Sequence, residues 1–201
     1  MKSPLGIIFL TIAIDLIGFG MVVPLLPLYA QQFGATGTQV AFLFASYSLM
    51  QFLFAPVWGR LSDRVGRRPV LLASIAGNAV ALLCFGLAPT YAWLLAARLV
   101  AGLCTANISV ANAYVADITT PENRAKGMGL VGAAFGIGFV IGPFLGGELS
   151  AFGYRAPALV ASGLGALNLL GAWLRLPESL ATDRPRGPRP GLWRERLQAL
   201  G

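Results

Sequence analysis

The stretch GRLSDRVGRRPV, residues Gly59–Val70, decides the fold, because it places four arginines and one aspartate between two strongly apolar segments. Only 11% of the residues in the whole chain are charged, so this cluster is unusual. Short basic loops between apolar segments are typical of the cytoplasmic surface of a membrane protein. We therefore predict that the segments on both sides of this stretch cross a membrane.

Composition agrees with a membrane protein. The 201 residues are 56% hydrophobic and have a mean hydropathy of +0.71, which is too apolar for an ordinary soluble domain. A helix-length window gives segments of about twenty residues, each long enough to cross a hydrocarbon core of roughly 30 Å. These segments are 5–29, 40–58, 70–88, 91–116, 127–150 and 156–176. The predicted fold class is an all-α membrane protein with six transmembrane helices.

The basic residues indicate the orientation. With six crossings, one side of the membrane receives Lys2, Arg60, Arg64, Arg67, Arg68, Arg124, Lys126, Arg175, Arg184, Arg186, Arg189, Arg194 and Arg196. Only Arg155 lies in a loop on the other side. The positive-inside rule then places both termini in the cytoplasm of a multi-pass protein of the cell membrane. This topology accounts for the net charge of +7, so we expect lipid headgroups as partners and no nucleic acid.

The sequence gives little support for a signal peptide, a metal site or an enzyme. The apolar run after Lys2 contains Asp15 and two prolines and lacks a signal-peptide cleavage pattern, so we interpret it as a retained helix. Cys84 and Cys104 have no CxxC spacing, and the chain has no histidine. We therefore expect no metal, no cofactor and no enzyme activity, because no nucleophile and base stand out.

Two charged residues lie deep in predicted helices. Asp15 and Arg98 are about ten and seven residues from the ends of their segments, which corresponds to roughly 10–15 Å of depth. Such charges are costly in a membrane and need a partner or a wet cavity. They could neutralise each other or backbone carbonyls, or they could move ions or substrate. Each lies in the first helix of a three-helix half, and the two halves enter from opposite sides as inverted repeats.

A glycine-rich stretch, GIGFVIGPFLGG, occupies residues 136–147. Gly138, Gly142 and Gly146 recur every four residues, so they line one face where a neighbouring helix can approach closely. Pro143 cannot donate a backbone hydrogen bond, so we expect a kink there. Gly147 completes the paired glycines at the end of the stretch.

Four stretches resemble signatures of the major facilitator superfamily. The loop Gly59–Val70 resembles its signature between helices two and three, and GFVIGPFLGG resembles its antiporter signature in helix five. DLIGFGMVVPLLP (15–27) and RLVAG (98–102) are similar to its helix-one and helix-four signatures in drug:proton antiporters. The likeness to tetracycline and multidrug efflux proteins covers residues 5–178. It implies an N-terminal six-helix half at 1–178, followed by an interdomain linker at 179–201.

The resemblance assigns a latch to the basic loop. Asp63 would approach a helix N-terminus of the other half, where the helix dipole favours its charge, and Arg67 would pair with Asp63 and Asp117. Gly59 and Gly66 would permit tight turns. Two further arginines, Arg64 and Arg68, would add charge that faces headgroups or partner carbonyls. The alternative is a stop-transfer cluster that only sets topology.

The resemblance also makes Asp15 and Arg98 candidates for proton coupling. Candidates for the substrate cavity are Tyr47, Gln51 and Asn107, although hydrogen bonding between helices would explain them equally well. Tetracycline pumps carry an aspartate where this chain has Ala81, which puts tetracycline in doubt.

The predicted function is proton-coupled efflux of small molecules by alternating access, with protons and a small-molecule substrate as partners. The missing C-terminal six-helix half, or a second copy of the chain, would complete the cavity. Two alternatives remain: a uniporter or importer on the same fold, and a half-length membrane subunit that transports nothing.

Overall fold

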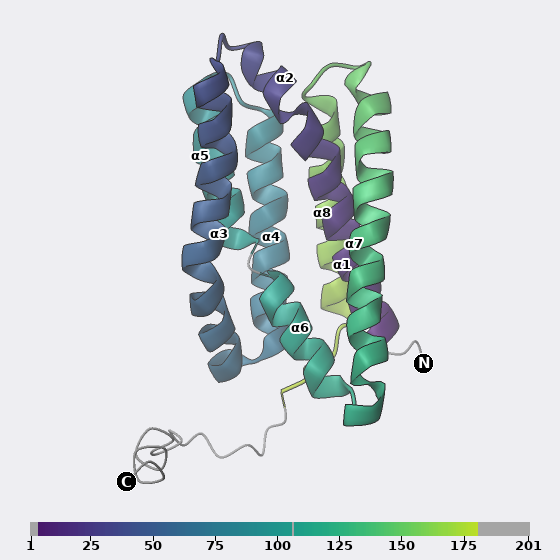
Figure 1. Ribbon diagram of the computed structural model, residues 1–201. Coiled ribbons are helices and arrows are strands. Elements are labelled where there is room, and N and C mark those ends of the chain that lie inside the picture. Colours follow the sequence, from purple (N-terminus) through teal and green to yellow (C-terminus); the bar gives the residue numbers. More distant parts are fainter. Residues whose placement is uncertain (1–3, 106, 181–201) are drawn as a thin grey trace, which may run out of the picture.

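A computed structural model describes residues 4–105 and 107–180, without the side chain of Asn107. The described elements are α1 (Pro4–Val22), a 3-10 turn η1 (Val23–Leu25), α2 (Leu26–Gln31), α3 (Gly37–Val65), α4 (Arg67–Gly86), α5 (Tyr91–Cys104), α6 (Asn107–Ile118), α7 (Pro121–Ser150) and α8 (Ala156–Arg175). They form an upright bundle (Figure 1). The helical class and the six spans predicted from the sequence are confirmed, because six helical stretches are long and apolar enough to cross a membrane.

The first span is not one regular helix, as the sequence analysis had expected for 5–29. Within Pro4–Gln31, α1 passes into η1 and then α2, and prolines stand at the start of both later elements. Pro24 and Pro27 lack the backbone N–H that a continuing helix needs, so each one loosens the turn before it. Tyr29 on α2 then donates from its hydroxyl to the carbonyls of Gly86 and Ala88, which fastens α2 to the end of α4.

The fourth span, expected as one helix over 91–116, is also divided. It consists of α5 and α6, and the backbone leaves the helix at Thr105. Side chains of α3 and α4 donate to successive carbonyls here: Trp58 to Leu103 (2.6 Å), Ser74 to Cys104, and Gln51 to Thr105 (3.4 Å). Backbone carbonyls freed inside a membrane need such partners, because hydrocarbon supplies none.

The helices pack with the symmetry of two inverted three-helix units. The first unit is α1, α3 and α4, and the second is α5 with α6, α7 and α8. The first helix of each unit packs on the second helix of the other, as α1 on α7 and α3 on α5. The third helices, α4 and α8, pack on each other. This pairing is expected for inverted repeats related by an axis in the membrane plane.

The contact between α1 and α7 depends on glycine. A Cβ added at Gly138 would lie 2.5 Å from the Leu16 Cβ, and one added at Gly142 would lie 2.7 Å from the Gly20 Cα. The third glycine of this face, Gly146, would bring a Cβ within 2.4 Å of the Met21 carbonyl oxygen. These distances leave no room for a side chain, so the two backbones touch along α7.

The other residues of the glycine-rich stretch behave differently. Gly147 faces open space, since no atom lies within 4 Å of an added Cβ. Pro143 lies inside α7, which continues from Pro121 to Ser150 without interruption.

Replacing Gly142 should separate α1 from α7. We expect Gly142→Ala to lower the free energy of unfolding by about 1–3 kcal/mol, the usual effect of overpacking a core. Gly147→Ala is the matched control, because its added methyl meets no atom within 4 Å. Thermal unfolding in mild detergent measures both. Equal midpoints for the two variants would show that the close approach of α1 and α7 is wrong.

Candidate functional site

The turn between α3 and α4 is much shorter than the sequence suggested. The loop was expected over residues 59–70, but α3 continues to Val65 and α4 begins at Arg67. The predicted turn at Gly59 is therefore wrong, since Gly59 lies inside α3. Gly66 alone makes the turn, with φ at 111°, a conformation that only glycine adopts without strain.

Arg67 is the centre of this end of the bundle. Its side chain is buried at 8% exposure, and three side chains hold its guanidinium. Nη2 lies 2.6 Å from Asp63 Oδ1, Nε donates to Asp117 Oδ2 over 3.1 Å, and Nη1 donates to Ser62 Oγ over 2.6 Å. The structure thus brings together the three charged residues that the resemblance had grouped. It joins the end of α3 to the end of α6 through the start of α4.

Glu178 belongs to the same cluster, and the sequence analysis did not identify it. Its Oε1 accepts from the Arg67 backbone N–H over 2.8 Å, and its Oε2 accepts from that of Arg68 over 3.2 Å. A carboxylate at these positions satisfies free N–H groups at the start of α4 and interacts favourably with the helix dipole. The only signal in the sequence is an acidic residue after Pro177, and its partner lies 111 positions away.

The two neighbouring arginines, Arg64 and Arg68, lie in different environments. Arg64 is exposed, as expected for a group at the headgroups. Arg68 is half-buried, and its Nη2 donates to the Trp173 carbonyl at the end of α8 over 2.6 Å. Arg68 therefore contacts a helix end, the second of the environments that the sequence analysis had allowed.

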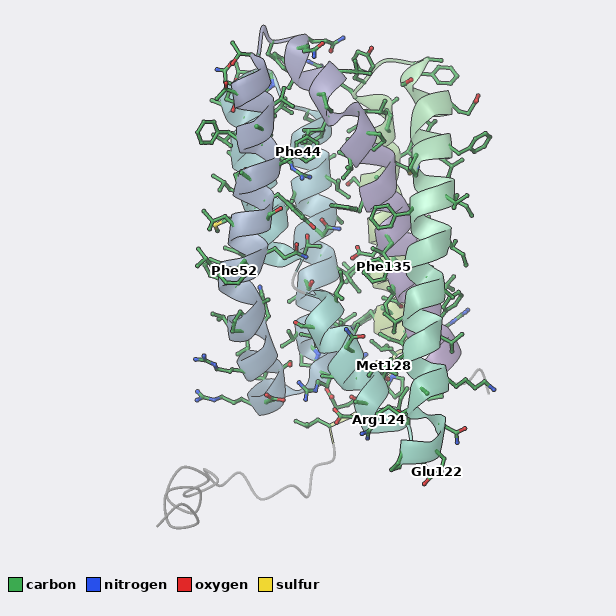
Figure 2. All side chains as sticks on the ribbon, viewed as in Figure 1. Phe44, Phe52, Glu122, Arg124, Met128 and Phe135 are labelled. Atoms are coloured by element: carbon green, nitrogen blue, oxygen red, sulfur yellow. The ribbon has the colours of Figure 1, made fainter. Side chains whose placement is uncertain are left out.

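Asp15 lies in a pocket of about 210 Å³ in the middle of the bundle. The lining residues come from α1, α3, α4, the α5–α6 break, α6 and α7: Ile12, Asp15, Leu16, Phe19, Tyr47, Gln51, Asn78, Thr105, Ile108, Ala111, Phe135 and Phe139. Figure 2 shows Phe135 on the side of α7 that faces the interior. Asp15 is the only titratable carboxylate on this wall.

Two polar residues that the sequence analysis missed surround the carboxylate. Asn78 on α4 donates from Nδ2 to Asp15 Oδ1 over 3.0 Å. Thr105, at the break between α5 and α6, lies with its hydroxyl 3.5 Å from Asn78 Oδ1. The helix break therefore lines the same pocket as Asp15 and reaches the carboxylate through Asn78. Uncharged polar residues recur along the predicted helices of this chain, so neither residue stood out in the sequence.

Arg98 lies outside the pocket and contacts one of its lining residues, Tyr47. Its guanidinium carbon lies 4.3 Å from the centroid of the Tyr47 ring, and its Nε donates to the Leu43 carbonyl over 3.4 Å. A cation over an aromatic face is attracted by the ring electrons, more strongly where water is excluded. Arg98 is 4% exposed and does not line the pocket, whereas Tyr47 does.

The cavity candidates differ in their placement. Tyr47 and Gln51 line the pocket, but the side chain of Asn107 lies outside the described part of the structure. Ala81 is buried beside Tyr47 and does not line the pocket. An aspartate at position 81 would therefore lie behind Tyr47 and outside the pocket.

Aromatic rings form most of the apolar wall. The centroid of the Phe19 ring lies 5.5 Å from that of Tyr47 and 6.3 Å from that of Phe139. The rings of Phe135 and Phe139 stack with their centroids 6.3 Å apart. Such a wall with one carboxylate suits an apolar molecule that carries a polar or positive group. No group of three metal-binding side chains occurs in residues 4–105 and 107–180.

Known sequences resemble this chain over nearly its whole length. The sequence profile of the Major Facilitator Superfamily matches residues 8–200. The class C tetracycline resistance protein of Escherichia coli is 43% identical over 186 residues, which are 91% of this chain and 47% of that protein. Multidrug resistance protein 2 of Bacillus subtilis is 33% identical, over 90% of this chain and 46% of that protein. The chain thus spans about half the length of the curated relatives it matches.

Solved structures agree with the sequence comparisons. The human organic anion transporter MFSD10 superposes with a TM-score of 0.79 at 32% identity, over 88% of this chain and 48% of that one. A bacterial homolog of the human lysosomal transporter Spinster shares the fold with a TM-score of 0.77 at 20% identity, over 94% of this chain and 47% of that one. The chain belongs to the Major Facilitator Superfamily.

Proposed function

We propose that this chain forms the N-terminal half of a proton-coupled efflux transporter that exports small molecules by alternating access. The observation that carries the proposal is Asp15, a carboxylate inside an aromatic pocket beside a broken membrane helix. Ionisable residues within membrane helices usually mark ion or substrate paths. Tetracycline and multidrug resistance proteins are among the relatives, which supports efflux.

Asp15 is suited to carry the coupled proton because of its partner. The Asn78 side chain has both an N–H donor and a carbonyl acceptor. As placed, its amide N–H donates to Asp15 Oδ1. After a flip of the amide, the same side chain accepts a hydrogen bond from the protonated acid. Asn78 can thus form a hydrogen bond with Asp15 in both protonation states while remaining neutral itself.

The substrate would bind at the same pocket, which is too small by itself. Its volume of about 210 Å³ lies below the roughly 300–1,000 Å³ of most small-molecule sites. Apolar side chains on α3 and α7 are strongly exposed beside it, among them Phe52 at 77% and Phe144 at 66% (Figure 2 labels Phe52). We propose that a second six-helix half, or a second copy, covers these helices and completes the cavity.

The Arg67 cluster would act as the cytoplasmic latch. The Asp63 side chain is 61% exposed although one oxygen touches Arg67. Asp63 can therefore meet a second partner beyond its own half, such as the positive end of a helix dipole. Arg67, held at 8% exposure by the α6 carboxylate Asp117, fixes the position from which Asp63 does so.

The first prediction of this proposal concerns orientation. Single cysteines at Thr38 and Val65, the two ends of α3, are introduced with Cys84 and Cys104 replaced by alanine. Both sites are exposed, and neither is in the Arg67 cluster. An impermeant thiol reagent added to intact cells should label Thr38→Cys only, because the arginine-rich end faces the cytoplasm. The reverse pattern would invert the proposed topology.

The second prediction concerns Asp15, tested in a chimera with the remaining half of the class C tetracycline resistance protein. Asp15→Asn should abolish uphill efflux driven by a pH gradient and preserve downhill exchange, because the amide cannot carry the proton. Glu148→Gln is the matched control, an exposed carboxylate near the end of α7. Transport into everted vesicles measures both. Normal pH-driven accumulation in Asp15→Asn would move the proton site elsewhere.

A third prediction separates the two carboxylates on Arg67. Asp63→Asn should leave stability within about 1 kcal/mol, since its side chain is largely exposed. Asp117→Asn should cost about 3 kcal/mol, because it removes a carboxylate from a buried guanidinium. Thermal unfolding in detergent compares them.

The two variants should rank in the opposite order in transport. Among folded molecules, Asp63→Asn should slow transport by the chimera more than Asp117→Asn does. Asp63→Asn should slow transport about tenfold, as expected for the loss of one charge-assisted contact. Parental transport by that variant would leave the Arg67 cluster with a structural role only.

A further inference from the structure

A second hollow lies between α1 and α8, apart from the pocket around Asp15. This groove has a volume of about 410 Å³. Its walls include Gly6, Leu10 and Ile14 on α1 and Leu167, Gly171 and Arg175 on α8. Leu10 and Leu167 are 55% and 66% exposed, so the groove opens toward the hydrocarbon.

The groove is apolar along its length and positive at one end. Between α1 and α8, the buried Asn168 donates to the Thr11 carbonyl over 2.9 Å, so the amide on the floor already has a partner. Leu167, Gly171 and Arg175 follow one face of α8 over about 12 Å, at a rise of 1.5 Å per residue. Arg175 is the last residue of α8, at the end of the bundle that carries the Arg67 cluster.

Arg175 is available to a ligand. It is exposed, and no ion pair involves it in residues 4–105 and 107–180. Trp173, beside it, is 57% exposed, and tryptophan favours the boundary between hydrocarbon and headgroups. A guanidinium at this depth can bind a phosphate with two parallel hydrogen bonds.

We propose that the groove between α1 and α8 binds one anionic phospholipid, with an acyl chain along Leu10, Gly171 and Leu167 and its phosphate on Arg175. The occupant must be apolar over most of its length and negative at one end, which describes such a lipid. A peptide helix would fit less well, because its backbone brings no charge to Arg175. Basic pockets between membrane helices recognise lipid headgroups in the same way. The site is independent of the proposed transport.

The test uses the whole 201-residue chain in mild detergent, with native mass spectrometry at increasing phosphatidylglycerol or phosphatidylcholine. One phosphatidylglycerol should bind more tightly than the rest and more tightly than phosphatidylcholine. Gly171→Leu should remove this lipid, because its side chain fills the groove without meeting protein atoms within 4 Å of its Cβ. Gly163→Leu is the control, equally open and on the same helix but outside the groove.

The charge is tested separately. Arg175→Gln should weaken phosphatidylglycerol about fivefold and leave phosphatidylcholine unchanged. Arg60→Gln removes the same charge from an exposed residue of α3 and should change neither. Equal weakening by both variants would reduce the effect to general surface charge and overturn the proposal.

Crosslinking in membranes keeps the test decisive if Gly171→Leu folds poorly. A photoreactive side chain replaces Leu10 in the groove or Leu53 on α3, which are similarly exposed at 55% and 52%. Phosphatidylglycerol should be captured at Leu10 in preference to phosphatidylcholine, and at Leu53 without preference. The proposal is wrong if lipid capture is the same at both positions, or if a protein is captured at Leu10.

Discussion

Hydrocarbon offers no hydrogen-bond partner, and every irregular feature of this bundle is constrained by that fact. Regular helices satisfy their own backbones, so the departures need side chains. At Thr105 the partners come from α3 and α4, and at the start of α4 the partner is Glu178. Both of these backbone sites therefore lie where a neighbouring segment supplies a polar side chain. This explains how a broken helix can line the pocket around Asp15.

The same constraint divides the buried cations into two kinds. Arg67 is held by two carboxylates and a hydroxyl, an arrangement that ties three helices together at the membrane surface. Arg98 has an aromatic face and a carbonyl instead. Tyr47 contacts Arg98 with its ring and also lines the pocket that holds Asp15, so one aromatic side chain lies next to both charged residues.

The sequence predicted the features that depend on composition and periodicity. The six spans follow from apolar length, and the packing face of Gly138, Gly142 and Gly146 follows from a spacing of four. Contacts between distant residues were predicted only where the family resemblance supplied them, as for Arg67 and Asp117. Glu178 caps a helix 111 positions away, and Asn78 has meaning only because α4 places it beside Asp15. Gly59 was misread because glycine is common in membrane helices as well as in turns.

Inverted symmetry suggests how the two three-helix repeats acquired different roles. Equivalent helices make equivalent contacts, yet the side chains along them differ in size and charge. Asp15 and Arg98 lie on the first helices of their repeats, but only Asp15 reaches the pocket. Gly6 lines a groove where α1 meets α8, whereas Trp93 donates to the Cys84 carbonyl where α5 meets α4. Because packing requires the backbones to match but not the side chains, one repeat can specialise while the shared scaffold remains intact.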